Sequence, residues 1–508
     1  MDTPNPDLNL GMFKAYDIRT PAAQLPLALS ERLAYAEAQY FREQLGADTV
    51  VLCRDARLSG ARYLEQGIRI FRELGFTVLA APQVTSTCQF YDACMRHPEA
   101  AGIMYGASHN PGGDTGQKIV GPGVQPIADG CGPDGGLQAI RRLYEQGARP
   151  PARGGGRLRL INYLDQYVRD SMALAGVGPG ELAGMRVLMD FLSGAAGQEF
   201  LAAFAIAGAE VVPRNLVPDG HFPSGAPNPV VRESIAPSLA LLQEGGFDCA
   251  MFFDGDGDRI DFIAPDGRQL SPAFNMIALA PRLRELFPDV EQPQLYVDLK
   301  ANPLAITHIA RRGFGVHVIR NGHSQIKEAL GRNARRGFVA AVEESSHYYL
   351  NFRRGERVFP AENTLFYGLL TARAWREDPR LYADLLELQG TTFREREWGY
   401  HFPSDELRAQ ALAAVEAAFV RQGGRSMSRT ADGMDMEATL IRDGLPFVID
   451  ASTPLSAEWT QVAQRVSQSE KGLARWEVTA GTAERRDAAV QLIEATVRQF
   501  GAGPRYVG

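Results

Sequence analysis

The sequence has no long hydrophobic run and no block of basic residues. No apolar stretch approaches the ~20 residues that a membrane helix needs, and the N-terminus lacks the basic and then apolar pattern of a secretory signal. Acidic residues outnumber basic ones by 60 to 53, which argues against nucleic acid as the main partner. These features predict a cytoplasmic protein that binds neither membranes nor nucleic acid.

Cysteine is also scarce, and the common nucleophile motif of hydrolases is missing. The chain has five cysteines, none of them in a C-x-x-C pair, which favours reduced thiols in a cytosolic protein. No G-x-S-x-G motif occurs, so an α/β-hydrolase has no support.

The length of 508 residues predicts roughly three or four domains. Short apolar segments, such as 49–53 and 76–80, alternate with helical patterns, which is typical of βαβ units with a mainly parallel sheet. A helix end, a glycine and a strand follow one another three times, around Gly75, Gly208 and Gly313. This recurrence predicts three related α/β domains, although the same pattern is common in any α/β protein.

Domain boundaries are expected where helix and strand breakers gather. Residues 148–156 are rich in Pro, Gly and Arg, a turn is expected at 265–267, and the βαβ rhythm fades after about Pro379. The predicted fold is α/β: three homologous domains with mixed or parallel sheets, followed by a smaller C-terminal α+β domain. The predicted ranges are 1–155, 156–266, 267–380 and 388–508.

Three aspartates alternate with glycine directly after an apolar strand: Asp254, Asp256 and Asp258. Such a loop leaves the carboxyl end of a strand, where open α/β folds bind ligands. Carboxylates at this spacing can fold around one hard cation such as Mg²⁺. An EF-hand would need Gly and Glu where Arg259 and Pro265 stand, so that alternative fails; an acidic surface turn is the remaining one.

A hydroxyl on a second loop is the candidate group-transfer residue. Ser108 is followed by His109, Asn110 and Pro111, and Lys118 comes ten residues after it. Serines at such positions are often helix caps, so the motif alone leaves a structural role open. Its pairing with the aspartate triplet favours a serine that carries a phosphoryl group beside a divalent metal.

Two more polar loops follow predicted strands. Glu343, Ser345 and His347 offer donors and acceptors that suit sugar hydroxyls, and a second loop contains His323. A solvated polar turn is the alternative for the first loop. Because four such loops leave four strand ends, we expect them to converge on one cleft.

Taken together, these motifs resemble the α-D-phosphohexomutase family, and most closely its bifunctional phosphomannomutase/phosphoglucomutase branch. The resemblance extends from Phe13 to about Asp435. The matching segments are 13–19 (the opening motif), 107–111 (the phosphoserine loop), 218–223 with 227–229, 254–259 (the metal loop) and 343–347 (the sugar loop).

The resemblance implies four domains around a central cleft and a phosphoserine at Ser108, which completes the Mg²⁺ site of the aspartates. It implies transfer through a hexose 1,6-bisphosphate, which also acts as activator. Arg19, Lys118 and Arg259 would neutralise charge or move protons, with His109 beside the serine. The implied substrate-binding residues are Lys300, His323, Glu343, Ser345 and His347.

The last predicted domain departs from the family because it lacks the R-x-S-x-T motif that binds the non-transferring phosphate. Arg475, Arg485 and Arg486 are the candidates to replace its arginine. The group that binds this distal phosphate therefore stays open, as does the oligomeric state.

The predicted function is a Mg²⁺-dependent mutase that interconverts 1- and 6-phosphates of mannose, glucose or both. The alternatives are a mutase for another sugar phosphate, such as glucosamine phosphate, and a non-catalytic relative that only binds sugar phosphates. A generic metallohydrolase is weaker, because no histidine ligand cluster accompanies the aspartates.

Overall fold

The computed structural model describes residues 8–430, 433–454, 456–467 and 472–506. The chain forms two compact units, and the chain passes between them more than once. Unit 1 contains the residues up to Gln269 together with His323–Ala334 and Ser346–Glu377; unit 2 contains Leu270–Gly322, Arg335–Ser345 and the residues from Asp378. Each unit combines helices with sheets, so the predicted α/β class is confirmed.

The first sheet of unit 1 has the strand order β1-β5-β4-β2-β3-β7, and β6 pairs with β5. β2, β3, β4 and β7 run parallel, whereas β5 is antiparallel to both β4 and β1. The strands are β1 (Ile18–Pro21), β2 (Thr49–Arg54), β3 (Thr77–Val84), β4 (Ala101–Tyr105), β5 (Asp114–Gly121), β6 (Gln125–Ile127) and β7 (Arg157–Leu160). Their helices are α1 (Leu27–Glu43), α2 (Gly60–Glu73), α3 (Thr87–Arg96) and α4 (Leu137–Gln146).

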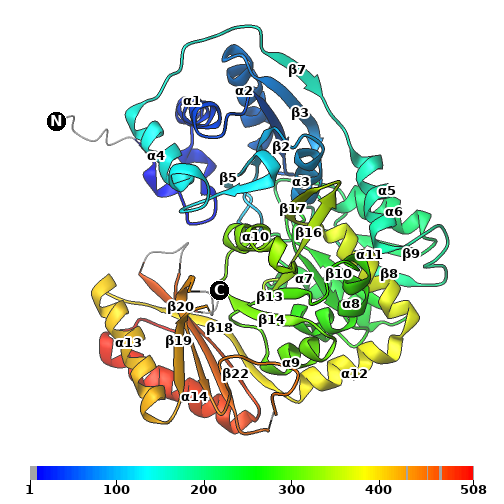
Figure 1. Ribbon diagram of the computed structural model, residues 1–508, viewed down its shortest axis with the longest axis vertical. Helices are drawn as coiled ribbons and strands as arrows, with labels where there is room; N and C mark the ends of the chain where they lie inside the picture. The colour runs from blue at the N-terminus through cyan, green and yellow to red at the C-terminus, as the bar shows by residue number, and fades with distance from the viewer. Residues whose placement is uncertain (1–7, 431–432, 455, 468–471, 507–508) are drawn as a thin grey trace. The chain divides into compact units, whose positions relative to one another are not determined.

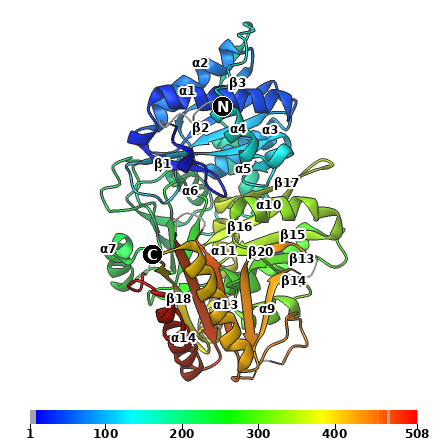
Figure 2. The same ribbon diagram turned by 90° about the vertical axis from the view of Figure 1, so that its left-hand side faces the viewer.

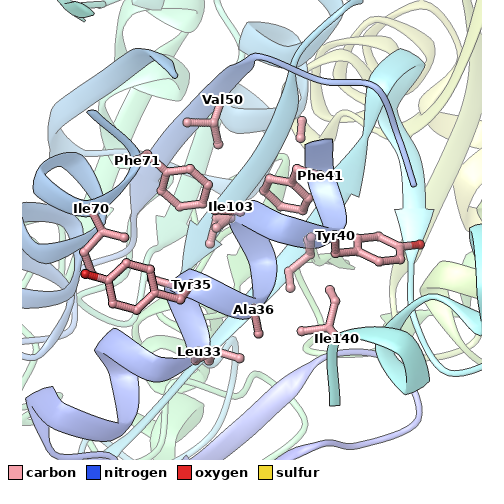
Figure 3. Close-up of a cluster of buried hydrophobic side chains, with 14 of the residues drawn as sticks. Leu33, Tyr35, Ala36, Tyr40, Phe41, Val50, Ile70, Phe71, Ile103 and Ile140 are labelled. Atoms are coloured by element: carbon pink, nitrogen blue, oxygen red, sulfur yellow. The ribbon is translucent and has the colours of Figure 1, made fainter. Parts of the chain in front are cut away.

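The core of this sheet lies between the strands and three of its helices. Figure 3 shows Phe41 of α1 and Phe71 of α2 among the aliphatic side chains of β2, β4 and α4. The two rings stack at a centroid distance of 5.9 Å, which adds to the burial of their apolar surface. This packing holds the parallel strands flat against the helices and so positions their carboxyl ends.

The second sheet of unit 1 has the order β12-β11-β10-β8-β9, with β8, β9 and β10 parallel. Its strands are β8 (Arg186–Asp190), β9 (Glu210–Arg214), β10 (Cys249–Phe253), β11 (Ile260–Ile263) and β12 (Gln269–Leu270). A hairpin of β16 (His347–Arg354) and β17 (Arg357–Glu362) also belongs to unit 1. The remaining helices are α5 (Leu164–Ala175), α6 (Gly197–Ile206), α7 (Arg232–Gln243), α10 (His323–Arg332) and α11 (Thr364–Glu377).

Unit 2 contains a parallel group of strands and a separate antiparallel sheet. β13 (Gln294–Asp298) pairs in parallel with β14 (Gly315–Ile319) and β15 (Phe338–Glu343), beside α8 (Pro272–Leu286), α9 (Pro303–Arg311) and α12 (Pro379–Gly390). The antiparallel sheet has the order β18-β22-β21-β20-β19. Its elements are β18 (Phe393–His401), α13 (Asp405–Arg421), β19 (Arg425–Arg429), β20 (Asp435–Asp443), β21 (Thr460–Val466), β22 (Leu473–Ala480) and α14 (Ala483–Val497).

The two helices of the antiparallel sheet pack on one face of it, around a core that includes Trp398 and Trp476 (Figures 1 and 2). This is the α+β arrangement that the sequence predicts for the C-terminal part. Of the described helices, none is long and apolar enough to cross a membrane.

The three glycines of the repeated pattern all adopt the conformation that the sequence predicts. Their φ angles are 86° at Gly75, 81° at Gly208 and 88° at Gly313, in the left-handed region that favours glycine. In each case the following strand lies parallel beside the strand that precedes the helix: β3 beside β2, β9 beside β8, and β14 beside β13. Common ancestry of these parts and the four domain boundaries stay predictions.

One carboxyl in unit 1, that of Glu37, is buried, and its oxygens have no hydrogen-bond partner among the described residues. Glu37 lies on α1 with none of its surface exposed. Burial raises the pKa of its carboxyl well above the ordinary value of 4.5, and the Gln117 side chain opposes this only in part. The folded protein therefore keeps a proton that the unfolded chain releases, and its free energy of unfolding falls as the pH rises above about 4.5.

We expect Glu37→Gln to remove this pH dependence. The variant should become more stable than the wild type as the pH rises, by about 1.4 kcal/mol per pH unit while the folded carboxyl stays protonated. Thermal unfolding midpoints measured between pH 4.5 and 8 test this. Glu43→Gln, at an exposed position of the same helix, is the control; parallel pH profiles for wild type and Glu37→Gln would contradict the prediction.

Candidate active site

The aspartate loop begins where β10 ends, and its side chains are fully enclosed. Asp254, Asp256 and Asp258 are at most 1% exposed, and oxygens of the three carboxylates lie within 4.8 Å of one another. The backbone N–H groups of Gly257 and Arg259 donate to Oδ1 of Asp254 at 3.1 and 3.2 Å, which fixes the turn. The loop thus gathers three carboxylates at the carboxyl end of a central strand.

The serine loop begins where β4 ends and meets the aspartate loop. The Oγ of Ser108 donates to Oδ2 of Asp254 at 2.8 Å, and it lies 3.2 Å from Nδ1 of His109. Ser108 has a φ of 47°, a left-handed conformation that is uncommon for a residue with a side chain and is typical of functional sites. The expected meeting of these two distant segments is therefore present in unit 1.

Gly255 makes this close approach possible. A Cβ atom at Gly255 would lie only 2.6 Å from the carbonyl oxygen of Ser108, so no other residue fits without moving one of the loops. Glycine between the aspartates is therefore required by packing against the serine loop.

Arg57 holds the backbone of the serine loop, a role that the sequence analysis missed. Its Nη2 donates to the carbonyl oxygens of Ser108 at 2.8 Å and Asn110 at 2.6 Å, and its Nη1 donates to Pro111 and Asp114. Asp55 pairs with this buried guanidinium at 3.2 Å. The alternation of Arg and Asp directly after the strand 49–53 was the available signal.

Cationic groups approach the carboxylates from two segments. Nζ of Lys118 lies 2.6 Å from Oδ2 of Asp256 and also contacts Asp258. Burial would lower the pKa of Lys118, but Asp256 and Asp258 outweigh it and raise the pKa above its ordinary value. Nε of Arg259 lies 3.7 Å from Oδ2 of Asp254. The ammonium therefore stays charged and offsets part of the repulsion between the carboxylates.

Arg19 and His109 lie at the serine loop. Nη1 of Arg19 donates to Oδ1 of Asn110 at 2.9 Å, and its guanidinium pairs with Asp17 at 2.8 Å. Burial, together with the charges of Arg259 and Arg19, lowers the pKa of His109 well below its ordinary value. The imidazole beside the Ser108 hydroxyl is therefore neutral.

The first turn of helix α3 donates hydrogen bonds to the aspartate loop. The sequence did not predict this contact. Oγ1 of Thr87 donates to Oδ2 of Asp256 at 2.6 Å, and the Thr87 N–H donates to the Asp256 carbonyl oxygen at 2.8 Å. Ser86 accepts from the N–H of Gln89 and donates to Glu199 at 2.6 Å. The first turn of α3 is thus joined to the loop that presents the carboxylates.

Two of the predicted substrate-binding residues lie near this cluster in unit 1. Nε of Arg259 donates to Nε2 of His347 at 3.1 Å, and the ring of His347 lies 6.2 Å from that of His323. Nδ1 of His347 lies 3.6 Å from Oε1 of Glu362, which pairs with Lys327 at 3.0 Å. His347 is therefore positioned by Arg259 of the aspartate loop and by Glu362 at the end of β17.

The other predicted substrate-binding residues belong to unit 2. Glu343 accepts from Nδ2 of Asn321 at 3.1 Å, and the same amide donates to Asp298 at 2.6 Å. Nζ of Lys300 lies 3.7 Å from Oδ2 of Asp298. Burial raises the pKa of Asp298 to about 8, against the charge of Lys300. Glu343 and Lys300 thus belong to one buried polar cluster, and Ser345 lies half-buried two residues after Glu343.

Glu344, between Glu343 and Ser345, has a structural role in unit 2. Its side chain accepts from Oγ of Ser271 at 2.8 Å and from Nη1 of Arg394 at 2.8 Å. The side chain is only 2% exposed, so these contacts satisfy a carboxylate that could not be buried alone.

The arginines considered for the distal phosphate all contact carboxylates. Arg485 pairs with Asp443 and Glu458, and Arg486 pairs with Asp487. Arg475 differs, because it shares Glu397 with Arg465 at 3.2 and 2.7 Å.

The surroundings of Glu397 are strongly positive. Burial would raise the pKa of Glu397, but the charges of Arg465, Lys300 and Arg475 outweigh it and lower that pKa to about 2. The three cations thus stabilise the ionised form of Glu397, and Lys300 also faces Asp298 and Glu477. No motif of the sequence connects Arg465 to Lys300, so its place here was not predicted.

The residues at the aspartate loop fit a divalent cation. Oδ1 of Asp256 and Oδ1 of Asp258 are buried and have no hydrogen-bond partner among the described residues. Buried carboxylate oxygens that nothing satisfies are costly unless they are neutralised or coordinate a metal. Oxygen ligands at this density match the preference of hard cations such as Mg²⁺.

The chain is similar to known proteins in both sequence and structure. Residues 11–130 match the family model for phosphoglucomutase/phosphomannomutase alpha/beta/alpha domain I, and residues 165–267 match the model for alpha/beta/alpha domain II. A phosphomannomutase from Salmonella montevideo is 29% identical over 448 residues, which cover 84% of this chain and 90% of that protein. A phosphomannomutase from Escherichia coli is 30% identical over 349 residues, or 67% of this chain and 73% of that protein.

A solved structure shares the fold. The phosphoglucomutase/phosphomannomutase family protein from Burkholderia thailandensis superposes with a TM-score of 0.74 at 19% identity, covering 97% of this chain and 98% of that one.

We expect the chain to bind one divalent cation at the aspartate loop. Asp256→Asn should weaken binding of Mn²⁺, used as a probe, by at least roughly tenfold, because removing even a supporting partner of a metal ligand has that effect. Isothermal titration calorimetry measures it. Asp266→Asn changes the same charge on an exposed turn and is the control; equal Mn²⁺ affinity in the two variants would count against the site.

Proposed function

Because the chain belongs to the phosphoglucomutase/phosphomannomutase family, the α-D-phosphohexomutases, we propose that this phosphohexose mutase interconverts the 1- and 6-phosphates of mannose, glucose or both. The reaction passes through a phosphoserine at Ser108 and a hexose 1,6-bisphosphate, which also primes the enzyme. The observation that carries this proposal is the 2.8 Å contact between Ser108 Oγ and Asp254 in a buried cluster of carboxylates and cations.

The chemistry has two phosphoryl transfers of opposite direction. In the first, the bond between phosphorus and Ser108 Oγ breaks and a bond to a sugar hydroxyl oxygen forms; the hydroxyl proton is released and Ser108 regains a proton. The bisphosphate then reorients. In the second transfer Ser108 Oγ attacks the other phosphate and its proton passes to a base; the bond between that phosphorus and the sugar oxygen breaks, and the sugar oxygen takes up a proton to become a hydroxyl. The substrate and product therefore differ only in the position of one phosphate.

The residues around Ser108 suit these steps. Neutral His109, 3.2 Å from Oγ, accepts the Ser108 proton in the second transfer. Lys118, Arg259 and Arg19 supply positive charge near the phosphoryl oxygens, which is what phosphoryl transfer needs most. Arg57 is a positioning residue, because it holds the loop carbonyls and not the reacting atoms.

Ser108, Asp254, Asp256 and Asp258 are the proposed Mg²⁺ ligands. When bound there, Mg²⁺ supplies positive charge that stabilises the charge of the transferring phosphoryl group. The buried oxygens of Asp256 and Asp258 without partners support this assignment.

We assign sugar binding to residues of both predicted polar loops. Glu343 and Ser345 would bind the 3- and 4-hydroxyls, and with the 2-position loosely bound, both glucose and mannose would be accepted. Lys300 would assist them within unit 2, and within unit 1 we assign substrate binding to His323 and His347. For the distal phosphate, the cations that face Glu397, which are Lys300, Arg465 and Arg475, are the candidates in place of the missing motif.

Two alternatives follow from the same family. A mutase for another sugar phosphate, such as glucosamine phosphate, differs only in the groups that bind the sugar, so a panel of sugar phosphates distinguishes it. A non-catalytic relative is the second alternative, motivated by the missing R-x-S-x-T motif. Intact mass spectrometry decides that case, since a phosphate on Ser108 that a sugar phosphate removes excludes binding alone.

We expect the wild type, with Mg²⁺ and a trace of glucose 1,6-bisphosphate, to convert mannose 1-phosphate or glucose 1-phosphate to the 6-phosphate. Ser108→Ala should lose at least about 10³-fold in kcat, because no acceptor for the phosphoryl group remains. A coupled dehydrogenase assay measures the 6-phosphate. Ser59→Ala, outside the cluster, is the matched control. Absence of product from the wild type, or unchanged turnover in Ser108→Ala, would refute the proposal.

We expect Arg57→Lys to lower kcat more than it changes KM. Lysine keeps the charge beside Asp55 but cannot hold four carbonyl oxygens at once, so Ser108 would lose its fixed position. A fall of roughly 10- to 100-fold in kcat is expected, since misplacement by about 1 Å costs that much. The thermal unfolding midpoint is the accompanying control. A rise in KM alone would mean that Arg57 acts on substrate binding.

A further inference from the structure

A surface cavity of about 520 Å³ lies in unit 1 and is unrelated to the residues discussed so far. The residues that line it are Met95, Arg96, His97, Pro98, Tyr163, Arg354, Arg357 and Phe359. Three of them are arginines and none is acidic. Its volume lies in the range of sites for small ligands, ~300–1,000 Å³.

Two of these arginines are held in place by carboxylates outside the lining. Arg96 pairs with Asp92 at 2.7 Å and with Asp170 at 2.6 Å, and Arg354 also contacts both aspartates. Asp92 is buried on α3, so its carboxylate orients the guanidinium groups of Arg96 and Arg354 from the protein side of the cavity. Arg357 stands opposite Arg354 in the β16–β17 hairpin and is exposed.

The remaining lining offers apolar and aromatic surface. Met95 and Phe359 are buried side chains that form part of the wall, and Tyr163 is half-buried, with its hydroxyl 2.8 Å from Nε2 of His97. The guanidinium of Arg96 lies 5.4 Å from the centre of the Tyr163 ring. A ligand with several negative charges and an apolar or aromatic portion could therefore bind the arginines with the first and the aromatic and apolar wall with the second.

The cavity is separate from the carboxylate cluster. Helix α3 contacts Asp256 through Thr87 at its first residue and lines the cavity with Arg96 at its last. Ten helical residues span about 15 Å. Similarly, β17 reaches the cluster with Glu362 at one end and the cavity with Arg357 at the other.

We propose that this cavity binds a small organic diphosphate, such as a nucleoside diphosphate, with the phosphates on Arg96, Arg354 and Arg357 and the organic part against Tyr163, Met95 and Pro98. Planar guanidinium groups bind phosphate oxygens two at a time, which favours a diphosphate over a single carboxylate. The inference goes beyond the proposed mutase reaction and does not require it.

Calorimetric titration of the full-length protein with ADP and with pyrophosphate tests the proposal. EDTA is included, so that no divalent cation recruits phosphate to the aspartate loop. The wild type should bind both probes, ADP more tightly because it adds contacts of the organic part. Arg357→Glu should weaken ADP binding at least roughly tenfold. Arg357→Gln is the milder second variant if the first does not fold.

Arg142→Glu makes the same charge change on an exposed face of α4 and should leave the affinity within about twofold. Three results would overturn the proposal: no binding of either probe by the wild type, unchanged affinity in the Arg357 variants, or an equal loss in Arg142→Glu. The last would mean that the overall charge and not the cavity attracts the anion.

Discussion

Mutual repulsion between three enclosed aspartates is the constraint on which the candidate site depends. Carboxylates within 4.8 Å repel one another by roughly 3.5 kcal/mol per pair at an effective dielectric constant of about 20. Burial and the charges of Asp256 and Asp258 accordingly raise the pKa of Asp254 well above its ordinary value. Lys118 and Arg259 offset part of this repulsion.

The need for positive charge beside the aspartates is met because two sheets of unit 1 contribute to the cluster. Lys118 comes from β5 of the first sheet, whereas the aspartates follow β10 of the second. Thr87 adds a hydrogen bond from the start of α3. The ion pairs between Lys118 and the aspartates connect the two sheets, and they require both partners. The site therefore stabilises the packing of unit 1, and the packing holds the site together. A serine held at this junction is close to both the negative and the positive groups that phosphoryl transfer uses.

Unit 2 contains a mixed cluster of opposite charges. Lys300, Arg465 and Arg475 face Glu397, and their charges lower its pKa to about 2. Lys300 also lies 3.7 Å from Asp298, so the cations of this cluster face more than one carboxylate. As at the aspartate loop, buried charges are stabilised here by opposite charges from distant segments of the chain.

The sequence by itself determined the features that short-range patterns encode. Alternation of apolar strands and helices predicted the α/β class, and the glycines at 75, 208 and 313 predicted left-handed turns, because only local backbone geometry is involved. The aspartate triplet and Ser108 could be singled out because their neighbours in the chain are distinctive.

Only the tertiary structure decided the partners of those residues, since charge and hydrogen-bond partners come from segments far apart. Thr87 and Arg465 belong to no recognisable motif, and their contacts, like those of Arg57, depend on how sheets and helices bring distant segments together.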